Sequence, residues 1–222
     1  MMIHDILAQL TQVVALGKIN KNTPLPADML GQDGASELAF RALEQGITPQ
    51  AILNDGLLPG MSIIGEKFSR GEAFIANMLI SAQAMNAAME HLKPYFASGE
   101  IKSTGTLVLG TVQGDLHDIG KNLVKMILKG DGWEVIDLGT NVSSEAFLNA
   151  ISSHSDAIVG LSALLTTTML NMGEVTETLK KHNPETRVYI GGAPVSQSFC
   201  QEIGADGYFR DPHSFAKSLR LD

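Results

Sequence analysis

Several features that would indicate particular classes of protein are scarce in this 222-residue chain. The single cysteine, Cys200, excludes a disulfide framework within the chain and is consistent with a reducing compartment. We interpret Cys200 as a half-buried, inert thiol, because neither a histidine nor a second cysteine lies near it in sequence. The formal net charge of −8 argues against a nucleic-acid partner, because phosphates need a basic surface.

Signals for export, membranes and nucleotides are also lacking. The first residues, Met-Met-Ile-His-Asp-Ile-Leu, carry an acid where a signal peptide needs a basic region. No apolar run approaches the roughly 20 residues that span a bilayer. The segment Gly110-Thr-Val-Gln-Gly114 has neither the glycine spacing of a dinucleotide fingerprint nor the Gly-Lys-Ser/Thr of a P-loop. We therefore expect a cytoplasmic protein whose partners include neither membranes nor nucleic acids.

The remaining composition, with 44% hydrophobic and 18% charged residues, is typical of a soluble globular protein. The length is sufficient for two modest domains. Up to about residue 96 the apolar residues follow a helical period only, in four segments that begin near residues 3, 36, 49 and 74. Pro59-Gly60 interrupts the third pattern, and the fourth helix is expected to end at Lys93-Pro94. Four such helices predict a bundle.

The period changes at Thr104, where strand-like runs begin to alternate with helical stretches. Alternation of this kind predicts a parallel sheet covered by helices on both faces. We expect strands at 106–111, 133–138, 156–161, 187–190 and 207–209, and helices at 120–129, 144–152, 167–182, 196–203 and after residue 212. The predicted fold class is α/β, with a four-helix bundle as cap domain (1–96), a linker (97–103) and a doubly wound, five-stranded domain of the Rossmann or flavodoxin type (104–222).

The loop after the first predicted strand carries the most unusual residues. It contains Asp115-Leu116-His117-Asp118-Ile119-Gly120, a histidine flanked by carboxylates in a glycine-bounded turn. In an open parallel sheet such loops gather at the carboxyl ends of the strands, where ligands bind. One ring nitrogen of His117 can therefore reach a large ligand, while Asp115 holds the other nitrogen and fixes the tautomer.

Two further strand-to-helix loops are expected beside the His117 loop. The run 162–168, Ser-Ala-Leu-Leu-Thr-Thr-Thr, follows the third strand, and Gly191-Gly192-Ala193-Pro194 follows the fourth. Each alone is ordinary turn chemistry, but their joint placement indicates a site. The two glycines would let a ligand or another chain approach the backbone. A catalytic zinc is disfavoured, because His117 with Asp115 or Asp118 supplies at most two close ligands and such a zinc usually has three.

These residues resemble a known family. The series Asp115-x-His117-x-x-Gly120, Ser162-x-Leu164 and Gly191-Gly192 is similar to the pattern of cobalamin-binding domains of the methionine-synthase type. The preceding Gly60-Met61 and the run from Gly65 to Phe74, Gly-Glu-Lys-Phe-Ser-Arg-Gly-Glu-Ala-Phe, resemble the helical cap of that family. A free-standing pair of such domains is similar to the corrinoid proteins of methyltransferase systems that act on methanol, methylamines or aryl methyl ethers.

The resemblance implies that cobalamin, as methylcobalamin or another corrinoid, binds with its own base detached from cobalt and its tail buried in the α/β domain. His117 would be the lower axial cobalt ligand, Asp115 would bond its other nitrogen, and Thr168, in place of a family serine, would continue the relay as the third catalytic residue. The implied cofactor-binding residues here are Gly114, Asp115, Leu116, His117, Asp118, Ile119, Gly120, Ser162, Leu164, Thr166, Thr168, Gly191 and Gly192.

The resemblance also implies that the cap lays Phe68, Phe74, Ile75 and Met78 over the upper face of the cofactor. After that phenylalanine the family often has Leu-Pro-Glu or Leu-Pro-Gln, whereas this chain has Ile-Ala-Asn at 75–77. The chain would carry a methyl group without being catalytic alone, and the linker would be the hinge that lets the cap swing aside. The implied partners are a substrate-specific methyltransferase and a second methyltransferase that accepts the methyl group, with a reductive activator as a further candidate.

Other interpretations remain open on sequence alone. The small subunit of an adenosylcobalamin-dependent mutase shares the His117-type loop but not the preceding cap, so residues 36–96 count against it. A cobalamin-sensing regulator of transcription needs a basic helix-turn-helix, which the sequence lacks. A flavodoxin-like domain with an ordinary loop histidine needs no cobalamin. We interpret the other histidines as surface residues: His4, His91, His154, His182 and His213.

Overall fold

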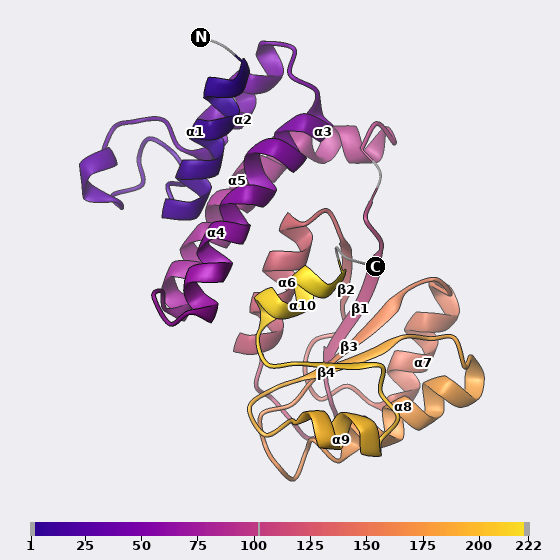
Figure 1. Cartoon of the computed structure of the whole chain (residues 1–222). Coiled ribbons are helices and arrows are strands. Elements are labelled where there is room, and N and C mark those ends of the chain that lie inside the picture. The colour runs from indigo at the N-terminus through magenta and orange to yellow at the C-terminus, as the bar shows by residue number, and fades with distance from the viewer. Residues whose placement is uncertain (1–2, 102, 220–222) are drawn as a thin grey trace. The chain divides into compact units, whose positions relative to one another are not determined.

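The chain folds into two compact units in a computed structural model, which describes residues 3–101 and 103–219 (Figure 1). The first unit, called here the helical unit, comprises Met1–Ser103 with Lys129–Gly132. The second, called the α/β unit, comprises Thr104–Leu128 with Trp133–Asp222. Among the described residues, no helix is long and apolar enough to cross a membrane.

The helical unit is a bundle whose helices pack through small and aliphatic side chains. Helix α1 packs against α2, α4 and α5, and α5 also packs against α2 and α4. Residues of the buried faces include Leu10, Leu38, Leu57 and Met85, each at most 2% exposed. The elements are α1 (Ile3–Leu16), a 3-10 turn η1 (Ala27–Met29), α2 (Ala35–Glu44), α3 (Pro49–Ala51), a π-helical turn η2 (Ile52–Leu57), α4 (Leu58–Ser69) and α5 (Ile75–Ala97).

The helical path from α3 to α4 is continuous, so the interruption predicted at Pro59-Gly60 is wrong. Pro59 lies in the first turn of α4, directly after the π-helical turn η2, and the helical path accommodates it there. Gly60 instead allows close packing between helices, because a Cβ atom at this position would lie 2.7 Å from the Thr11 carbonyl oxygen on α1.

Helix α5 also continues beyond its predicted end at Lys93-Pro94. It ends at Ala97, with Pro94 inside it. The helix persists because Ser98 N donates to Pro94 O at 3.0 Å, which closes a further turn on the carboxyl side of the proline. The ring of Pro94 removes one N–H donor from the helix but leaves its own carbonyl available.

The α/β unit contains a five-stranded, all-parallel sheet in the order β2-β1-β3-β4-β5. The predicted doubly wound fold is therefore confirmed, with helices α6 and α10 on one side of the sheet and α7, α8 and α9 on the other (Figure 1). The strands are β1 (Thr106–Thr111), β2 (Glu134–Asp137), β3 (Ile158–Ser162), β4 (Val188–Gly191) and β5 (Gly207–Phe209). The helices are α6 (Ile119–Gly130), α7 (Ser144–Ser153), α8 (Asn171–His182), α9 (Gln197–Glu202) and α10 (Pro212–Leu219).

The strand register aligns the ends of the three central strands. Thr111 of β1 pairs with Ser162 of β3, and Ser162 pairs with Gly191 of β4. The chain order reverses at β1, which has β2 on one side and β3 on the other. Such a reversal leaves a crevice at the carboxyl edge of the sheet, which is where ligands of doubly wound folds bind. The loops that follow β1, β3 and β4 therefore meet at this crevice.

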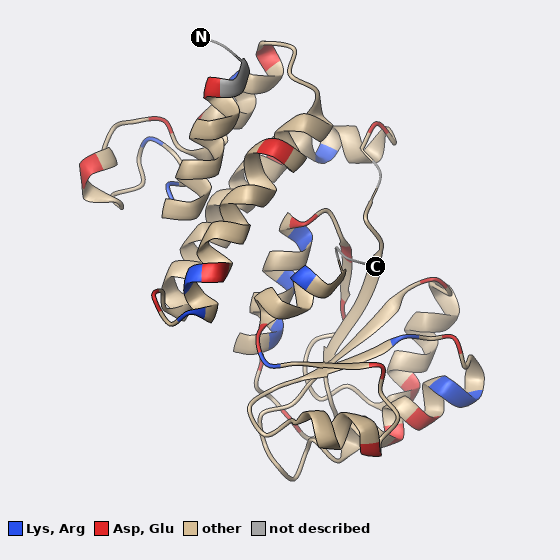
Figure 2. Cartoon of the chain, in the orientation of Figure 1, with Lys and Arg blue, Asp and Glu red and all other residues tan. Residues whose placement is uncertain are grey.

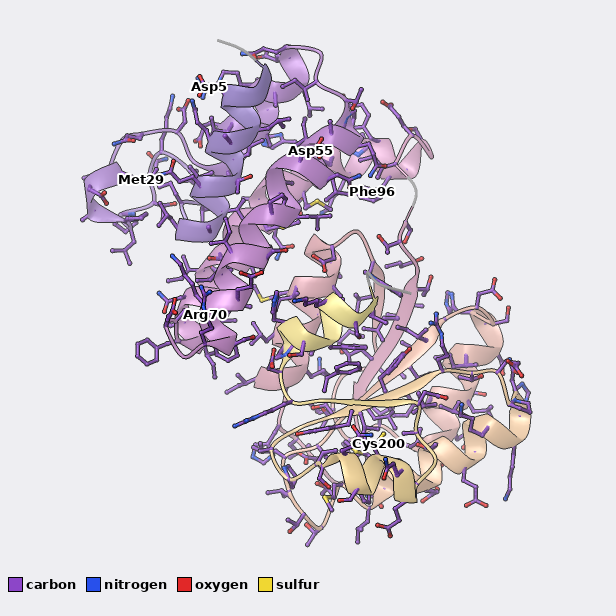
Figure 3. The ribbon with its side chains drawn as sticks, in the orientation of Figure 1. Asp5, Met29, Asp55, Arg70, Phe96 and Cys200 are labelled. Atoms are coloured by element: carbon purple, nitrogen blue, oxygen red, sulfur yellow. The ribbon has the colours of Figure 1, made fainter. Side chains whose placement is uncertain are left out.

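Two side chains are more buried than the sequence suggested. Cys200, on the side of α9 that faces the sheet (Figure 3), is 1% exposed rather than half-buried. Burial, with the nearby Asp206 carboxylate, raises the pKa of its thiol, so the thiol stays protonated and inert. His213 is 6% exposed and not a surface residue. His91 is half-buried beside Ser36 Oγ, 2.9 Å from its Nε2, while the side chain of His4 lies outside the described residues.

Candidate functional site

The His117 loop joins β1 to α6 and presents its imidazole to solvent. The His117 side chain is 51% exposed, whereas the Asp115 side chain is fully buried. His117 Nδ1 lies 2.8 Å from Asp115 Oδ1, and the same oxygen accepts from the His117 backbone N–H at 3.0 Å. An ionised carboxylate can only accept, so Nδ1 must carry the proton of this hydrogen bond. The lone pair of the neutral ring then lies on Nε2, the nitrogen that a metal could bind.

The second oxygen of Asp115 is bound by the loop after β3. Asp115 Oδ2 accepts from Thr168 Oγ1 at 2.7 Å and from the backbone N–H groups of Leu164 at 2.8 Å and Leu165 at 3.4 Å. Burial acts to raise the pKa of Asp115, but the hydrogen bonds from Thr168, Leu164 and His117 outweigh it and hold the pKa well below its usual range. The carboxylate is therefore ionised at neutral pH and joins the two loops.

The remaining predicted residues of the α/β unit differ in how far their side chains are exposed to solvent. Ser162 is half-buried at the end of β3, Leu164 is 45% exposed, Thr166 is exposed and Thr168 is 7% exposed. Nothing lies within 4 Å of where a Cβ of Gly120 would be, so the space in front of this glycine is open. The structure thus joins His117 and Thr168 through hydrogen bonds to Asp115 and leaves the space at Gly120 open.

The glycine pair at the end of β4, where Gly191 is the last strand residue, is required for a different reason from the one expected. Gly192 has φ +134°, and a Cβ there would lie 1.8 Å from the Ala163 carbonyl oxygen. The close approach that requires a glycine is thus made by the chain's own β3 loop. The backbone at Gly192 accordingly lies close against that loop.

Exposed apolar side chains flank His117 in its loop. Leu116 is 73% exposed and Ile119 is 71% exposed, which is unusual for residues of this size. The β3 loop adds further exposed leucines at the same edge: Leu164, Leu165 and Leu170. An apolar surface with one projecting imidazole suits a broad, flat ligand that can accept a nitrogen ligand at its centre.

The chemistry of the donor set fits a metal held by a macrocycle. Within the described residues there is no group of three or more histidine, cysteine or acidic side chains that could hold a metal ion. One imidazole does not retain a free ion, which in proteins needs three or four ligands. A single imidazole suffices when a macrocycle such as corrin supplies the other ligands.

The predicted cap residues lie in the helical unit, near the turn between α4 and α5. Phe74 is 76% exposed and Ile75 is 49% exposed, whereas Phe68 is half-buried and Met78 is 1% exposed. Asn77, where the family often has glutamate or glutamine, caps α5 by accepting from Phe74 N at 2.9 Å through its Oδ1. Of the four predicted residues, Phe74 and Ile75 offer the apolar surface.

Sequence reasoning missed three residues that contact the His117 loop. Thr111 Oγ1 donates to His117 O at 2.9 Å, Asn141 Oδ1 accepts from Gly114 N at 2.8 Å, and Asn171 Nδ2 donates to Gln113 O at 2.7 Å. Each lies at the carboxyl edge, at the end of β1, after β2 or at the start of α8. Their positions near the ends of predicted strands could have indicated a role in the site. Hydroxyl and amide side chains are common in turns, however, so these positions alone did not single them out.

Comparison with known proteins agrees with this geometry. Residues 105–214 match the B12 binding domain, and residues 30–93 match a second family described as a B12 binding domain. The chain is 40% identical over 178 residues to trimethylamine corrinoid protein 1 of Methanosarcina acetivorans. The aligned region covers 78% of this chain and 82% of that protein.

Solved structures show the same arrangement of elements. A cobalamin-binding protein of Desulfitobacterium hafniense has a TM-score of 0.77 and 29% identity, with 97% of both chains covered. The methanol:cobalamin methyltransferase complex of Methanosarcina barkeri contains a chain with a TM-score of 0.77 and 28% identity, covering 98% of this chain and 79% of that chain.

The fold and the two domain matches define a two-domain cobalamin-binding protein. The chain belongs to the corrinoid proteins of methyltransferase systems. The match to the helical segment favours this family over a mutase subunit, in which that segment is not expected, and the α/β match excludes a flavodoxin-like domain without cobalamin.

Proposed function

We propose that this protein is a methyl carrier that binds cobalamin base-off, with His117 as the lower axial ligand. The observation that carries the proposal is the exposed imidazole whose Nδ1 is held at 2.8 Å by a fully buried carboxylate, so that Nε2 is directed outward as the donor. Cobalamin, when bound, supplies a cobalt centre that can hold a methyl group and pass it on.

Asp115 and Thr168 keep the imidazole in the ligating tautomer. The carboxylate accepts the Nδ1 proton and is itself fixed by the Thr168 hydroxyl at 2.7 Å. A partner of this kind raises the basicity of the ring and typically changes metal affinity about 10- to 100-fold. If the imidazole is released, Asp115 can stabilise a proton taken up by the ring, so the three residues can hold or return a proton at Nε2.

The open crevice beside these residues is our candidate for the buried tail. Ser162, Leu164 and Thr166 would line it, the backbone of Gly191 and Gly192 would form its wall, and Gly114 and Gly120 would leave room at the loop. Leu116, Asp118 and Ile119 would lie beneath the flat ring, and Leu116 and Ile119 would offer it exposed apolar surface.

We further propose that the helical unit covers the upper face, chiefly through Phe74 and Ile75. The predicted linker 97–103 would be the hinge by which the units separate when a partner enzyme needs access. Lys102 of this linker lies outside the described residues. A donor-specific methyltransferase would load the carrier, and a second methyltransferase would unload it. A reductive activator would restore carriers whose cobalt has been oxidised.

The similarity to a trimethylamine corrinoid protein makes a methylated amine the first donor to test. The donor would be bound and activated by the partner enzyme. On this proposal the purified chain does not demethylate any donor by itself, and its activity depends on added methyltransferase. Co-purification of the carrier with its methyltransferases would identify the donor.

Replacement of His117 tests the ligand assignment. The wild-type protein, labelled with 15N, is loaded with unlabelled hydroxocobalamin, reduced to the Co(II) form and measured by electron spin resonance. An axial nitrogen from the protein then gives a doublet splitting, whereas the cofactor's own base would give a triplet. We expect His117→Ala to lose this splitting and to bind cobalamin at least about 10-fold more weakly. The exposed His182 is the matched control, and His182→Ala should behave as wild type. Retention of the nitrogen signal by His117→Ala would refute the assignment.

A further inference from the structure

The backbone of the His117 loop is fixed by residues outside the three motifs. Thr111, the last residue of β1, is fully buried, and its Oγ1 donates to the carbonyl of His117 itself at 2.9 Å. The Thr111 peptide is in turn fixed, because its N–H donates to Gly139 O at 3.0 Å and its carbonyl accepts from Val142 N at 3.0 Å. The position of the His117 carbonyl is thereby tied to the sheet rather than to the loop.

Asn141 holds the other end of the loop by two hydrogen bonds. Its side-chain oxygen accepts from Gly114 N at 2.8 Å, and its own N–H donates to Asp115 O at 2.9 Å. Asn141 is the one non-glycine residue with a positive φ among the described residues, at 55°. Asparagine tolerates this left-handed conformation better than most residues, but a bulky or branched residue does not. Asn171 adds a third bond, from Nδ2 to Gln113 O at 2.7 Å.

These bonds act on the backbone that carries the imidazole. Asp115 fixes the ring relative to its own side chain, but the direction of Nε2 also depends on the peptide units from Gly114 to His117. A loop that is already ordered loses little conformational freedom when a ligand binds. A metal ligand that is held within a narrow range of positions binds more tightly than one that must first be ordered.

We propose that Thr111 and Asn141 are positioning residues that hold the His117 loop in its ligating conformation before cobalamin arrives. This inference rests on the proposed role of His117 and extends it to two residues that make no contact with the imidazole ring. It predicts that the loop is protected in the apoprotein, and that loosening it weakens cobalt ligation while Asp115, Thr168 and the imidazole are all still present.

Substitutions at Thr111 separate the hydrogen bond from side-chain volume. Thr111→Val keeps the shape but removes the hydroxyl, whereas Thr111→Ser keeps the hydroxyl. The matched control is Thr176 on α8, which is 1% exposed and donates to Met172 O at 2.7 Å, away from the loop. Thr176→Val therefore removes a buried hydrogen bond of the same kind from the same unit.

Two measurements are made on each full-length variant. Amide hydrogen exchange of residues 113–118 in the apoprotein reports the loop itself. Titration of the 15N-labelled protein with hydroxocobalamin, followed by spin resonance of the Co(II) form, reports the affinity and the fraction whose axial nitrogen comes from the protein. We expect Thr111→Val to exchange faster in the loop, to bind about 10-fold more weakly and to lose part of the nitrogen splitting. Thr111→Ser and Thr176→Val should resemble wild type in all three readouts.

A second pair of variants makes the test independent of Thr111. Asn141→Gly keeps the left-handed backbone accessible but removes the acceptor for Gly114 N, whereas Asn141→Asp keeps the acceptor and also tolerates positive φ. The control is Asn183, whose Oδ1 accepts from Glu185 N at 3.0 Å in a turn away from the site. We expect Asn141→Gly to lose loop protection and nitrogen ligation, and both Asn141→Asp and Asn183→Gly to retain them.

The outcomes separate this inference from the proposed function. If wild type ligates cobalt through His117 while Thr111→Val and Asn141→Gly ligate and exchange as wild type does, the positioning role is wrong. Equal losses in Thr176→Val and Thr111→Val would also overturn it, since the effect would then be a general loss of stability. If His117→Ala keeps the nitrogen signal, the ligand assignment fails instead, whatever the exchange data show.

Discussion

At the scale of residues, the centre of the site is a single buried carboxylate. Asp115 is fully buried, and its two oxygens accept hydrogen bonds from the β1 loop on one side and the β3 loop on the other. A buried charge needs such partners, because an unpaired one costs several kcal/mol. The same bonds that stabilise the charge therefore also fix the tautomer of His117.

Gly120 allows cobalamin binding to be separated from folding. A Cβ at this position meets nothing within 4 Å, and alanine is favoured over glycine in a helix, so Gly120→Ala should not destabilise the apoprotein. We expect the same variant to bind hydroxocobalamin more weakly, because the added methyl group would enter the space proposed for the tail. The expected loss of affinity is at least about 10-fold, as for the replacement of a residue that supports a metal ligand.

Thermal unfolding and cobalamin titration together check this prediction. Asn149→Ala, an exposed position on α7, is the control for a general change in helix stability. Unchanged cobalamin affinity in Gly120→Ala would show that the tail does not pass in front of this glycine.

Asp137 gives the stability of the α/β unit a dependence on acid that does not arise from the Asp115–His117 pair. Its carboxylate accepts from Lys121, whose side chain is 3% exposed, at 2.7 Å and from Lys125 at 2.8 Å, and Figure 2 shows the basic residues along α6. Burial alone would raise the pKa of Asp137, but the hydrogen bonds from Lys121, Lys125 and Gly139 lower it to about 2. A lowered pKa contributes stability that is present above the unfolded-state value, near 3.9, and is lost as the pH falls through the folded-state value.

We therefore expect the free energy of unfolding to fall by up to about 2 kcal/mol between roughly pH 4 and pH 2 because of this one group. Asp137→Asn should be less stable by roughly 3 kcal/mol at pH 7, because Lys121 is left buried without its counter-charge. The difference in free energy of unfolding between variant and wild type should become smaller as the pH falls, as measured by urea unfolding across this range. A gap that stays constant with pH would contradict the assignment.

Among the helices, α5 contains a residue that lowers its stability. Pro94 lies inside the helix and is exposed, and proline in a helix interior is roughly 3 kcal/mol less favourable than alanine. Alanine also leaves the unfolded chain more conformational freedom than proline does, so Pro94→Ala should stabilise the protein by a smaller amount, about 1–2 kcal/mol, measured as a higher midpoint of thermal unfolding.

Pro59, in the first turn of α4, is the matched control. A proline there is compatible with the helix, so Pro59→Ala should bring no gain. An equal stabilisation by both substitutions would contradict this explanation, because the gain would then not depend on the interior position of Pro94, and the unfolded chain by itself favours proline over alanine.

The elements of the fold were largely predictable, because each depends on local burial. The run 106–111, buried from its second residue on, forms β1 with the predicted bounds, and β5 likewise spans the predicted 207–209. The other three strands differ from prediction by one or two residues at their ends. The errors lie where tertiary contacts decide. Pro59-Gly60 suggested a break, but Gly60 is needed for contact with α1, and α8 begins at Asn171 rather than near residue 167.

For the molecule as a whole, we expect the linker between the two units to be the preferred site of proteolysis. Residues 97–100 are exposed, and Glu100 is followed by the buried Ile101. If the linker is the hinge that we propose, a glutamate-specific protease should cut the apoprotein first after Glu100, because cleavage needs a locally extended backbone. Glu44 and Glu66, within helices, should be cut later.

Mass spectrometry of the early fragments measures the order of cleavage. Added hydroxocobalamin should slow the cut after Glu100, since a cofactor held by both units would restrict the hinge. First cleavage inside α4 or α5, or no effect of the cofactor, would argue against a hinge in this segment.

Local sequence patterns were enough to predict the classes of element, the two-part organisation and the motif that resembles the corrinoid proteins. These follow from local signals: a helical period, strand-like runs, and Asp115 two residues before His117. The bonds on which the site depends were decided only by the tertiary structure. Thr168 reaches Asp115, and Asn141 reaches Gly114, because the parallel register brings together the carboxyl ends of strands far apart in sequence. No local pattern specifies such pairs, since each depends on how every crossover returns its strand to the sheet.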